Sequence, residues 1–480
     1  MKLNELRGRA PQLPLSLELD NGQTLIIEQW LRVLPGQRYV GKAQWQGRSV
    51  LAKLFVGNKA ARDYQRELAG AHLLTEQQIS SAAVLNAEQQ ADGSAYLLLE
   101  FIDNAQSLAL AWQACSAEAP LSERQTAVLG AALKAVAQMH ARGLWQSDLH
   151  LDNLLQRNNE VYVVDGGGVH SEQAGRPLSH EKVIANLAVF FAQLPSALDV
   201  HLEELLIHYL LANGEHALRL ENLHKQILSI RRWRMKDYLK KAGRECSLFS
   251  AKINLFGLRV VWRAAQDELE SVLAAPDAAI ANGHIYKTGG AATVARVDAG
   301  QHRYVVKRYN IKNPLHWLKR FWRPSRAWQS WREGHRLSVL GIATPQPLAV
   351  LENRWFGLRG SAWLISEYCG GQDIIARLAA YQNDDAVPEA EIAALVELLS
   401  ALIREKISHG DLKGHNILWH QERCYLIDLD AMQQHLSMRS FTRAYMKDRT
   451  RLLRNWPQHS LLYTLLDQRL PQLPSSCLED

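Results

Sequence analysis

The chain has 480 residues, of which 47% are hydrophobic, and this length suffices for two or three domains with buried cores. Its five cysteines follow neither a disulfide framework nor a zinc-site spacing, which predicts a reducing compartment. No stretch approaches the roughly 18 apolar residues of a membrane-spanning helix, and arginines and prolines interrupt the N-terminus where a signal peptide needs an apolar core. The sequence therefore predicts a cytoplasmic protein.

The net charge of +6 is distributed unevenly along the chain. Residues 1–230 contain 19 Lys and Arg against 24 Asp and Glu, whereas residues 231–480 contain 36 against 25. The two halves therefore carry about −5 and +11. A basic half next to an acidic half indicates a polyanionic partner on one side only, such as phospholipid, phosphorylated sugar or nucleic acid.

The two halves repeat one order of features. In the first half, predicted strands end in SVLAKLF around Lys53; a helix with Glu67, an apolar strand AYLLLEFI, a helix ending in AQMHARGL, and the segments SDLHLDNLL and VYVVDGGG follow. In the second half the order is RYVVKRY with Lys307, SWREGHRLSVL with Glu333, AWLISEYC, a helix ending in LIREKI, HGDLKGHNILW and CYLIDLD. Such internal repetition predicts two domains of one architecture.

The spacings agree best around three polar residues. In both halves an Asp is followed five residues later by an Asn and seventeen residues later by a second Asp. The Lys-to-Glu spacing differs, at fourteen and twenty-six residues, which predicts an insertion in the second half. We expect domains at 1–235 and 276–480, joined by a basic linker region at 236–275 that interrupts the repeated pattern.

This set of residue types is what phosphoryl transfer from ATP requires: a Lys on the phosphates, a helix Glu that orients it, an acceptor-orienting Asp, and Asn and Asp ligands for magnesium. The predicted set is Lys53, Glu67, Asp148, Asn153 and Asp165 in the first domain and Lys307, Glu333, Asp411, Asn416 and Asp428 in the second. A single DLxxxN pattern is weak, but two occurrences in the same context argue against chance. For the two Glu residues, a solvated helix face is the alternative interpretation.

Two further elements would bind the nucleotide. The hinge strands are predicted to offer backbone groups to adenine around Glu100, Ile102, Glu367 and Cys369. Gly36 and Gly41 in the first half and Gly289 and Gly290 in the second are candidates for phosphate-binding loops. Their spacing is looser than a GxGxxG run, and turn glycines explain them equally well.

At these motifs the chain resembles the lipopolysaccharide core kinases, the heptose and Kdo kinase family of Gram-negative bacteria. HGDLKGHNIL with YLIDLD, SDLHLDNLL with VYVVDGGG, and RRWRMKDYLKKAGRECSLF carry the resemblance. It implies an α+β fold of two consecutive protein-kinase-like domains, each a β-rich N-lobe plus a small, mainly helical C-lobe. It also implies that ATP and Mg²⁺ serve to phosphorylate a sugar hydroxyl of a lipid-linked core oligosaccharide, with peripheral contact at the inner face of the cytoplasmic membrane.

The chain departs from this pattern at several positions. Gln146 stands where the second half has His409, and the magnesium-binding motifs read DGG and DLD. Neither change removes a required ligand, although the first domain could be weakened or specialised. No APE motif follows either motif, which argues against a protein kinase. The alternatives are a small-molecule kinase of the aminoglycoside or choline type and a catalytically silent tandem that binds nucleotide and organises envelope-synthesis enzymes.

The insertion in the second half is basic and aromatic. It contains Trp317, Trp322, Trp328 and Trp331, interleaved with Lys319, Arg320, Arg323, Arg326 and Arg332. Such a segment could contact anionic lipid or grip a phosphorylated core sugar, or its tryptophans could simply pack the N-lobe. No nucleic acid partner is expected, because no recognised binding fold accompanies the charge.

Overall fold

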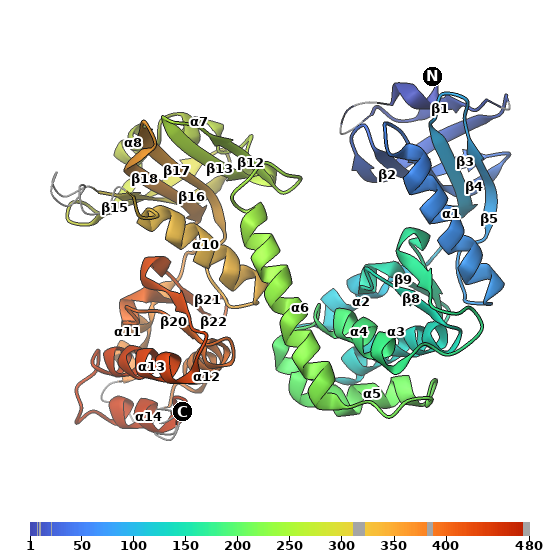
Figure 1. Ribbon diagram of the computed structural model, residues 1–480. Coiled ribbons are helices and arrows are strands. Elements are labelled where there is room, and N and C mark those ends of the chain that lie inside the picture. The colour runs from blue at the N-terminus through green and yellow to red at the C-terminus, as the bar shows by residue number, and fades with distance from the viewer. Residues whose placement is uncertain (7, 9–10, 21, 311–321, 382–386, 474–480) are drawn as a thin grey trace. The chain divides into compact units, whose positions relative to one another are not determined.

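The computed structural model describes the chain except for residues 7, 9–10, 21, 311–321, 382–386 and 474–480. The chain divides into two compact units, Met1–Arg232 and Trp233–Asp480. Each unit combines one large antiparallel sheet with a mainly helical region, so the predicted α+β class is confirmed (Figure 1). Helix α6 (Leu220–Lys241) runs across the division. Over the described residues, no helix has the length and apolar character needed to cross a membrane.

The sheet of the first unit has six strands in the order β1-β2-β3-β4-β6-β5. Apolar residues of β4, such as Val50, Ala52 and Leu54, are fully buried, and Lys53 lies among them. The sheet therefore presents this lysine from a central strand. The strands are β1 (Leu15–Glu18), β2 (Thr24–Leu34), β3 (Arg38–Trp45), β4 (Arg48–Phe55), β5 (Val84–Gln89) and β6 (Ala95–Glu100).

Helix α1 (Ala60–Glu76) follows β4 and buries Glu67, and the remaining helices form a separate region. Ser122 starts the longest of these, α3, by accepting a hydrogen bond from the N–H of Gln125, as a helix cap does. The helices are α2 (Leu108–Cys115), α3 (Glu123–Ala141), α4 (His180–Phe191) and α5 (Leu202–Leu210). Short strands lie beside them: β7 (Gln106–Ser107), β8 (Leu144–Gln146), β9 (Leu154–Arg157), β10 (Glu160–Val163) and β11 (Val169–Ser171).

The sheet of the second unit has seven strands in the order β12-β13-β17-β18-β16-β15-β14. Its last five strands have the same neighbours as β5, β6, β4, β3 and β2 of the first unit, and Lys307 on β16 corresponds to Lys53 on β4. The strands are β12 (Phe249–Ile253), β13 (Gly257–Trp262), β14 (His284–Lys287), β15 (Ala292–Ala299), β16 (His302–Tyr309), β17 (Pro347–Trp355) and β18 (Leu358–Glu367).

The helices of the second unit come in the same order along the chain as those of the first unit. Helix α10 (Arg326–Val339) carries Glu333 as α1 carries Glu67, and Ser325 caps it. The others are α7 (Glu270–Ala274), α8 (Pro276–Asn282), α11 (Ile374–Leu378), α12 (Glu389–Arg404), α13 (Met438–Leu453) and α14 (Leu461–Arg469). The short strands are β19 (Gln372–Asp373), β20 (Ile407–Ser408), β21 (Ile417–His420), β22 (Arg423–Leu426) and β23 (Gln433–Gln434).

The expected linker region at 236–275 needs correction, because most of it belongs to the second unit's sheet and its helices. Strands β12 and β13 form a hairpin, and β13 pairs with β17, with Val260 opposite Val350. Phe249, Val260 and Trp331 are buried in one cluster. The segment folds because its alternating apolar residues have this cluster to cover, and the small-residue run after it forms α7 and α8.

The tryptophans of the basic insertion do not share one environment. Trp331 is fully buried, and its indole N–H donates to the carbonyl of Ala242 at 2.8 Å. Trp328 is half-buried, and Trp322 is exposed. Trp317, Lys319 and Arg320 lie outside the described residues. Packing therefore explains Trp331, whereas Trp322 remains at the surface.

Replacing Trp331 with Ala should lower the free energy of unfolding of the second unit by about 3–5 kcal/mol, because it empties a buried site and removes a satisfied hydrogen bond. Trp355→Ala is the matched control, because this side chain is 64% exposed, and it should change stability little. Urea unfolding of the full chain measures both. Equal effects would contradict the assigned packing.

Candidate active site

Hydrogen bonds to backbone carbonyls bring together Asp411, Asn416 and Asp428 in the second unit. Asp411 follows β20, and Asn416 ends a short 3₁₀ turn before β21. The side-chain amide of Asn416 donates to the carbonyl of Asp411 at 2.9 Å. The N–H of Ile427 donates to the carbonyl of Asn416 at 3.0 Å, which sets Asn416 beside Asp428. Three residues spread over seventeen positions thus form one cluster.

Asp428 has a left-handed backbone conformation, with φ of 62°, and faces the lysine from the sheet. The ammonium of Lys307 donates to the Oδ1 atom of Asp428 at 2.5 Å. Burial acts to raise the pKa of Asp428, but the positive charges of Lys307 and then Arg326 outweigh it and hold the pKa below its usual value. Asp428 is therefore an ionised carboxylate at neutral pH.

The first unit repeats this arrangement with its own residues. The amide of Asn153 donates to the carbonyl of Asp148 at 2.8 Å, and the N–H of Val164 donates to the carbonyl of Asn153 at 2.9 Å. Asp165 has φ of 67°, and its carboxylate accepts from Lys53 at 3.2 Å. The pKa of Asp165 is also lowered, because Lys53 and Arg38 outweigh the effect of burial.

These residues fit a magnesium ion on the chemistry of their donors. In both clusters the Asn uses its side-chain N–H for the neighbouring Asp carbonyl, so its amide oxygen remains as an acceptor. An amide oxygen and a carboxylate are hard oxygen ligands of the kind that magnesium prefers. Among the described residues there is no group of three or more His, Cys, Asp or Glu that could hold a metal. Magnesium usually binds through one or two carboxylates together with water and substrate phosphates.

The two Asp residues that the sequence predicts to orient the acceptor, Asp148 and Asp411, differ in their surroundings. Asp411 is bound by two cations that the sequence analysis did not single out, Lys413 at 3.1 Å and Arg451 at 3.0 Å. Lys413 stands inside the motif HGDLKGHN and could have been identified there, whereas Arg451 comes from α13 and only the fold brings it close. The side chain of Asp148 is 74% exposed, with His150 at 3.7 Å.

The predicted ion pair between the lysine of the sheet and the glutamate of the helix forms in the first unit. Lys53 donates to Glu67, and both side chains are buried. In the second unit no ion pair joins Lys307 to Glu333, although the structure describes both residues. The predicted ion pair between Lys307 and Glu333 is therefore wrong.

Arg336 explains this difference. It binds the Oε2 atom of Glu333 at 2.8 Å, and Gln329 reaches the Oε1 atom at 3.4 Å. The residue three positions after Glu67 on α1 is Gly70, which has no side chain that could compete in this way.

Close packing explains the glycines of the DGG motif in the first unit. A Cβ atom on Gly70 would lie 1.8 Å from the carbonyl oxygen of Gly166, and one on Gly166 would lie 2.7 Å from the carbonyl of Glu67. Helix α1 therefore sits directly on the loop after Asp165. In the second unit Leu429 takes the place of Gly166. The glycines are required by this close approach, and Asp165 itself is retained.

Gln146 and His409 perform the same local task. His409 is fully buried and its Nε2 atom lies 3.0 Å from the carbonyl of Ile427, the residue before Asp428. The amide of Gln146 donates to the carbonyls of Val164 at 2.9 Å and Asp165 at 3.0 Å. Burial lowers the pKa of His409, which keeps the imidazole neutral with one N–H to donate. An amide and a neutral imidazole each supply this donor.

The hinge residues end the expected strands. Glu100 is the last residue of β6 and Glu367 the last of β18, and both backbone N–H groups are used, by Ala83 at 2.8 Å and Gln346 at 3.0 Å. Any contact of Glu100 or Glu367 with adenine must therefore use atoms of these residues other than the backbone N–H. Ile102 is buried and Cys369 is half-buried, and burial raises the pKa of the Cys369 thiol.

The glycine loops are turns in the structure. Gly289 and Gly290 join β14 to β15 with φ of 78° and 61°, and a Cβ atom at either position would meet nothing within 4 Å. Gly36 likewise has φ of 66°. Gly41 lies inside β3, where a Cβ atom would come within 2.7 Å of the carbonyl of Gln29. Turn geometry and strand packing account for these glycines, and a phosphate-binding role stays a prediction.

The comparison with known families gives the class of the second unit. Residues 279–462 match the Lipopolysaccharide kinase (Kdo/WaaP) family, so the C-terminal half contains a domain of that family. It is a family of ATP-using phosphotransferases that act on inner-core sugars of lipopolysaccharide.

A solved structure described as WaaP in complex with acyl carrier protein is similar to this chain at 17% identity, over 44% of this chain and 88% of that one, with a TM-score of 0.32. A score this low supports no argument about function. No curated protein matches the chain.

The shared task of Gln146 and His409 predicts the outcome of a substitution. His409→Gln should retain magnesium-dependent nucleotide binding by the second unit, because the amide can donate to Ile427 as Gln146 does to Val164. His409→Ala leaves that carbonyl unpaired next to Asp428 and should weaken binding about tenfold, at a cost of about 1–3 kcal/mol. Titration calorimetry with nucleotide and magnesium measures both variants, and equal affinities would contradict the assignment.

A second prediction concerns the pH dependence of stability. A series of buried hydrogen bonds supports the cluster of Asp148, Asn153 and Asp165 in the first unit. His140 Nε2 lies 3.0 Å from Asn186 Oδ1, and the Asn186 amide donates to the carbonyl of Gln146 at 2.6 Å. Burial lowers the pKa of His140 to about 4, from an ordinary imidazole value near 6.5. The unfolded chain therefore binds this proton first, and stability present above pH 6.5 is lost as the pH falls towards 4.

The measurement is the difference in unfolding free energy between the parent and His140→Gln at a series of pH values. This difference should shrink by on the order of 3 kcal/mol between pH 7 and pH 4, because only the parent must keep an uncharged imidazole. His72→Gln, at an exposed position of α1, is the control and should behave like the parent. A difference that stays constant with pH would disprove the assignment.

Proposed function

We propose that the chain is an ATP- and Mg²⁺-dependent sugar kinase that phosphorylates a heptose or another sugar hydroxyl of the lipopolysaccharide inner core, and that both units are protein-kinase-like domains with a phosphoryl-transfer site. The observation that supports this most is the repeated geometry. In each unit the Asn side chain donates to the carbonyl of the first Asp, the Asn carbonyl accepts from the residue before the second Asp, and a lysine from the sheet binds the second Asp. Chance would not reproduce these three contacts in both units.

The roles follow from the chemistry of each group. Lys53 and Lys307 would contact the nucleotide phosphates, and the Asn and second Asp of each cluster would hold magnesium, which neutralises phosphate charge. Asp148 and Asp411 would orient the acceptor hydroxyl and take its proton. Glu100, Ile102, Glu367 and Cys369 would line the adenine end, and Gly289 and Gly290 the phosphate end.

The acceptor-side charges of the second unit favour an anionic sugar. Lys413 and Arg451 bind the carboxylate of Asp411 and remain half-exposed, at 42% and 48% of the side chain. Cations at this place can also contact a carboxylate or phosphate carried by the acceptor. Core sugars that bear such groups suit this site better than neutral peptides do. The acceptor would be lipid-linked core oligosaccharide, as for the matched family.

The nucleotide-binding scaffold remains the second candidate for the first unit. The observation that favours it is the environment of Asp148, whose side chain is 74% exposed and has only a distant imidazole beside it, at 3.7 Å, among its recorded ionic neighbours in the described chain. By contrast, Lys53 of the same unit forms ion pairs with both Glu67 and Asp165. This unit could therefore bind nucleotide without transferring phosphate.

In an Asp148→Asn background, Asp411→Asn should lower phosphate transfer to dephosphorylated core oligosaccharide by about 10²–10⁴-fold while leaving ATP affinity within about twofold, because this carboxylate acts on the acceptor. Asp298→Asn, at an exposed position of β15, is the matched control and should retain full activity. A radiolabel transfer assay with a generic peptide in parallel tests the acceptor class. Normal turnover by Asp411→Asn in an Asp148→Asn background would overturn the proposal.

The single variants separate the two candidates for the first unit. If that unit is a kinase, Asp148→Asn should remove a distinct fraction of the phosphate incorporated, resolved by mass spectrometry of the product glycan. If Asp148→Asn leaves incorporation unchanged and Asp411→Asn abolishes it, the first unit is a binding module.

A further inference from the structure

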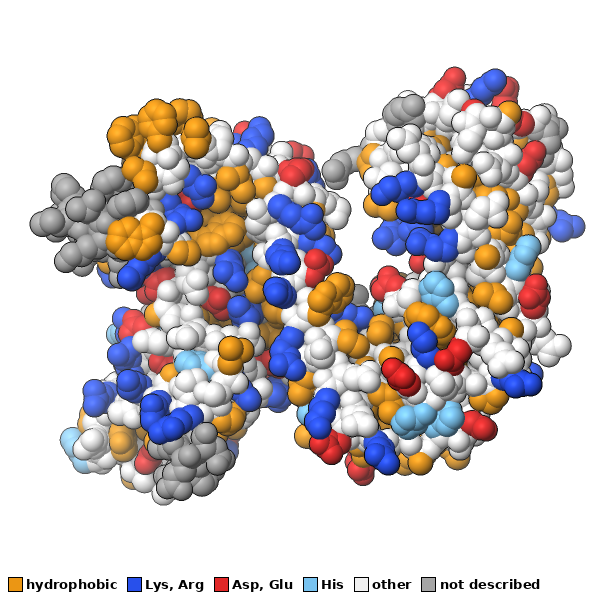
Figure 2. Space-filling view, viewed as in Figure 1, with side chains coloured by type: hydrophobic (Ala, Val, Ile, Leu, Met, Phe, Trp, Pro, Cys, Tyr) orange, Lys and Arg blue, Asp and Glu red, His pale blue; other side chains and the backbone are white. Residues whose placement is uncertain are grey.

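The sheet of the second unit ends in two neighbouring turns with exposed apolar side chains. The turn between β12 and β13 carries Leu255 and Phe256, and the turn between β17 and β18 carries Trp355 and Phe356. These four side chains, here called the apolar tip, are 58%, 62%, 64% and 63% exposed. The rings of Phe256 and Phe356 are in contact, with centroids 5.6 Å apart. Figure 2 shows hydrophobic side chains gathered at this end of the sheet, at the upper left.

Hydrogen bonds within and between the two turns pair several backbone groups of the apolar tip. The side-chain oxygen of Asn254 accepts from the N–H groups of Phe256 at 2.9 Å and Gly257 at 2.8 Å. The carbonyl of Phe256 accepts from the N–H of Arg354 at 2.8 Å, and that of Leu255 accepts from the second turn at the same distance. A turn whose hydrogen bonds are made internally can leave water at little cost, whereas unpaired groups would oppose it.

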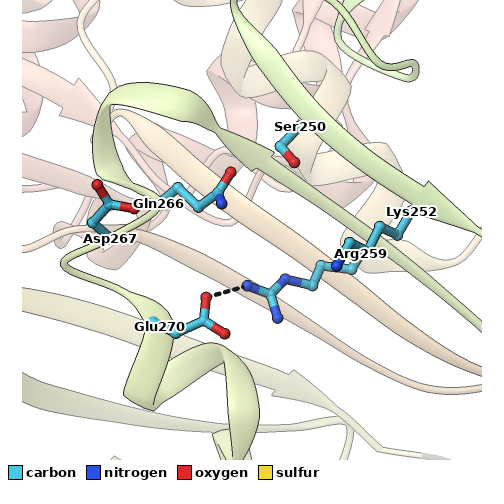
Figure 3. Close-up of a pocket in the computed structure, with 6 residues that line it drawn as sticks. All are labelled: Ser250, Lys252, Arg259, Gln266, Asp267 and Glu270. Carbon is cyan, nitrogen blue, oxygen red and sulfur yellow. Dashed lines mark hydrogen bonds and ion pairs between the residues drawn. The ribbon is translucent and has the colours of Figure 1, made fainter. Parts of the chain in front are cut away.

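Two cations lie directly behind the apolar tip. Lys252 on β12 is opposite Arg259 on β13, one position before the final pair of Ile253 and Leu258. Like charges directly opposite one another destabilise a sheet. Glu270 of α7 offsets part of this by binding Arg259 at 2.5 Å, while Lys252 remains exposed. Figure 3 shows the hollow, of about 430 Å³, that is lined by Ser250, Lys252, Arg259, Gln266, Asp267 and Glu270.

We propose that the apolar tip docks the second unit onto an anionic lipid bilayer, with the aromatic side chains at the acyl boundary and Lys252 and Arg259 among the headgroup phosphates. A strand rises about 3.3 Å per residue, so these cations lie roughly 10 Å behind Phe256, a depth that suits interfacial insertion. Aromatic residues favour this interface, and cations are attracted to anionic lipid.

Shape and charge favour a bilayer over a protein. Turn tips project from a sheet, and a fluid surface accommodates a projection without a matching cavity. The charge of about +11 on residues 231–480 complements anionic lipid. Trp322, from the basic insertion, is also exposed, and its carbonyl accepts from Arg359 of β18, so it lies beside the same hairpin. The inference does not depend on catalysis.

Co-sedimentation of the full chain with vesicles tests this without ATP or glycan. The parent should bind vesicles of phosphatidylglycerol and phosphatidylcholine, and bind pure phosphatidylcholine at least tenfold more weakly. Phe256→Ser combined with Trp355→Ser and Phe356→Ser should lower partition onto the anionic vesicles at least about tenfold, because three side chains lose their burial. Lys252→Gln with Arg259→Gln should lower it severalfold at low salt and little at high salt.

The matched control is Val200→Ser with Leu211→Ser and Leu436→Ser, three side chains that are 81%, 83% and 96% exposed elsewhere on the chain. This control should bind like the parent, and thermal unfolding should show that both triple variants remain folded. If the tip variant is unstable, bromine-labelled lipids give a second readout. They should quench the tryptophan fluorescence of the parent more than that of Trp355→Phe.

Three outcomes would overturn the proposal. The first is binding of anionic vesicles by a folded tip variant at the parent's level. The second is equal binding of the parent to both kinds of vesicle. The third is a dimer of the parent, seen by sedimentation, that the tip variant loses while vesicle binding is unchanged, because the apolar tip would then be an interface between copies of this chain.

Discussion

A lysine buried inside a protein must be paired, and in this chain that requirement joins the sheet of each unit to its helical region. Lys53 is 6% exposed and binds both Glu67 and Asp165, and Lys307 binds Asp428. Removing one partner of such a pair typically costs 3–5 kcal/mol, because an uncompensated charge stays buried. The left-handed Asp, the Asn beside it and the donor at position 146 or 409 all hold the carboxylate where the lysine reaches it.

The same constraint is met differently in the two units. In the first, Gly70 and Gly166 let α1 approach the loop after Asp165, and Glu67 joins the lysine. In the second, Arg336 stands three residues after Glu333 and neutralises it, and among the described residues Asp428 is the carboxylate that pairs with Lys307. Since a buried Glu also needs a partner, Arg336 makes the separation of Lys307 from Glu333 stable. The units therefore share a scaffold and differ in how the lysine of the sheet is oriented.

The sequence predicted the parts of each unit that depend on local pattern. The strands around Lys53 and Lys307 and the helices with Glu67 and Glu333 are confirmed, because alternation and helical periodicity determine them directly. Contacts made by distant residues could not be predicted this way. Arg451 reaches Asp411 from forty positions later, and the competition between Arg336 and Lys307 for Glu333 depends on side-chain reach. The sequence predicts a linker where the hairpin of β12 and β13 forms, because the partner strand of this hairpin, β17, lies far along the chain.

That hairpin also shows where the two units acquired different edges. The five strands common to both sheets are flanked by β1 beside β2 in the first unit and by β13 and β12 beside β17 in the second. The additions lie on opposite edges, because β2 corresponds to β14 and β17 corresponds to β5. Each addition covers the outermost common strand on its side, and β1 and β12 become the new edge strands. In the second unit the added strands do more, because the turn between them carries the exposed Leu255 and Phe256, and no turn in the described part of the first sheet corresponds to it.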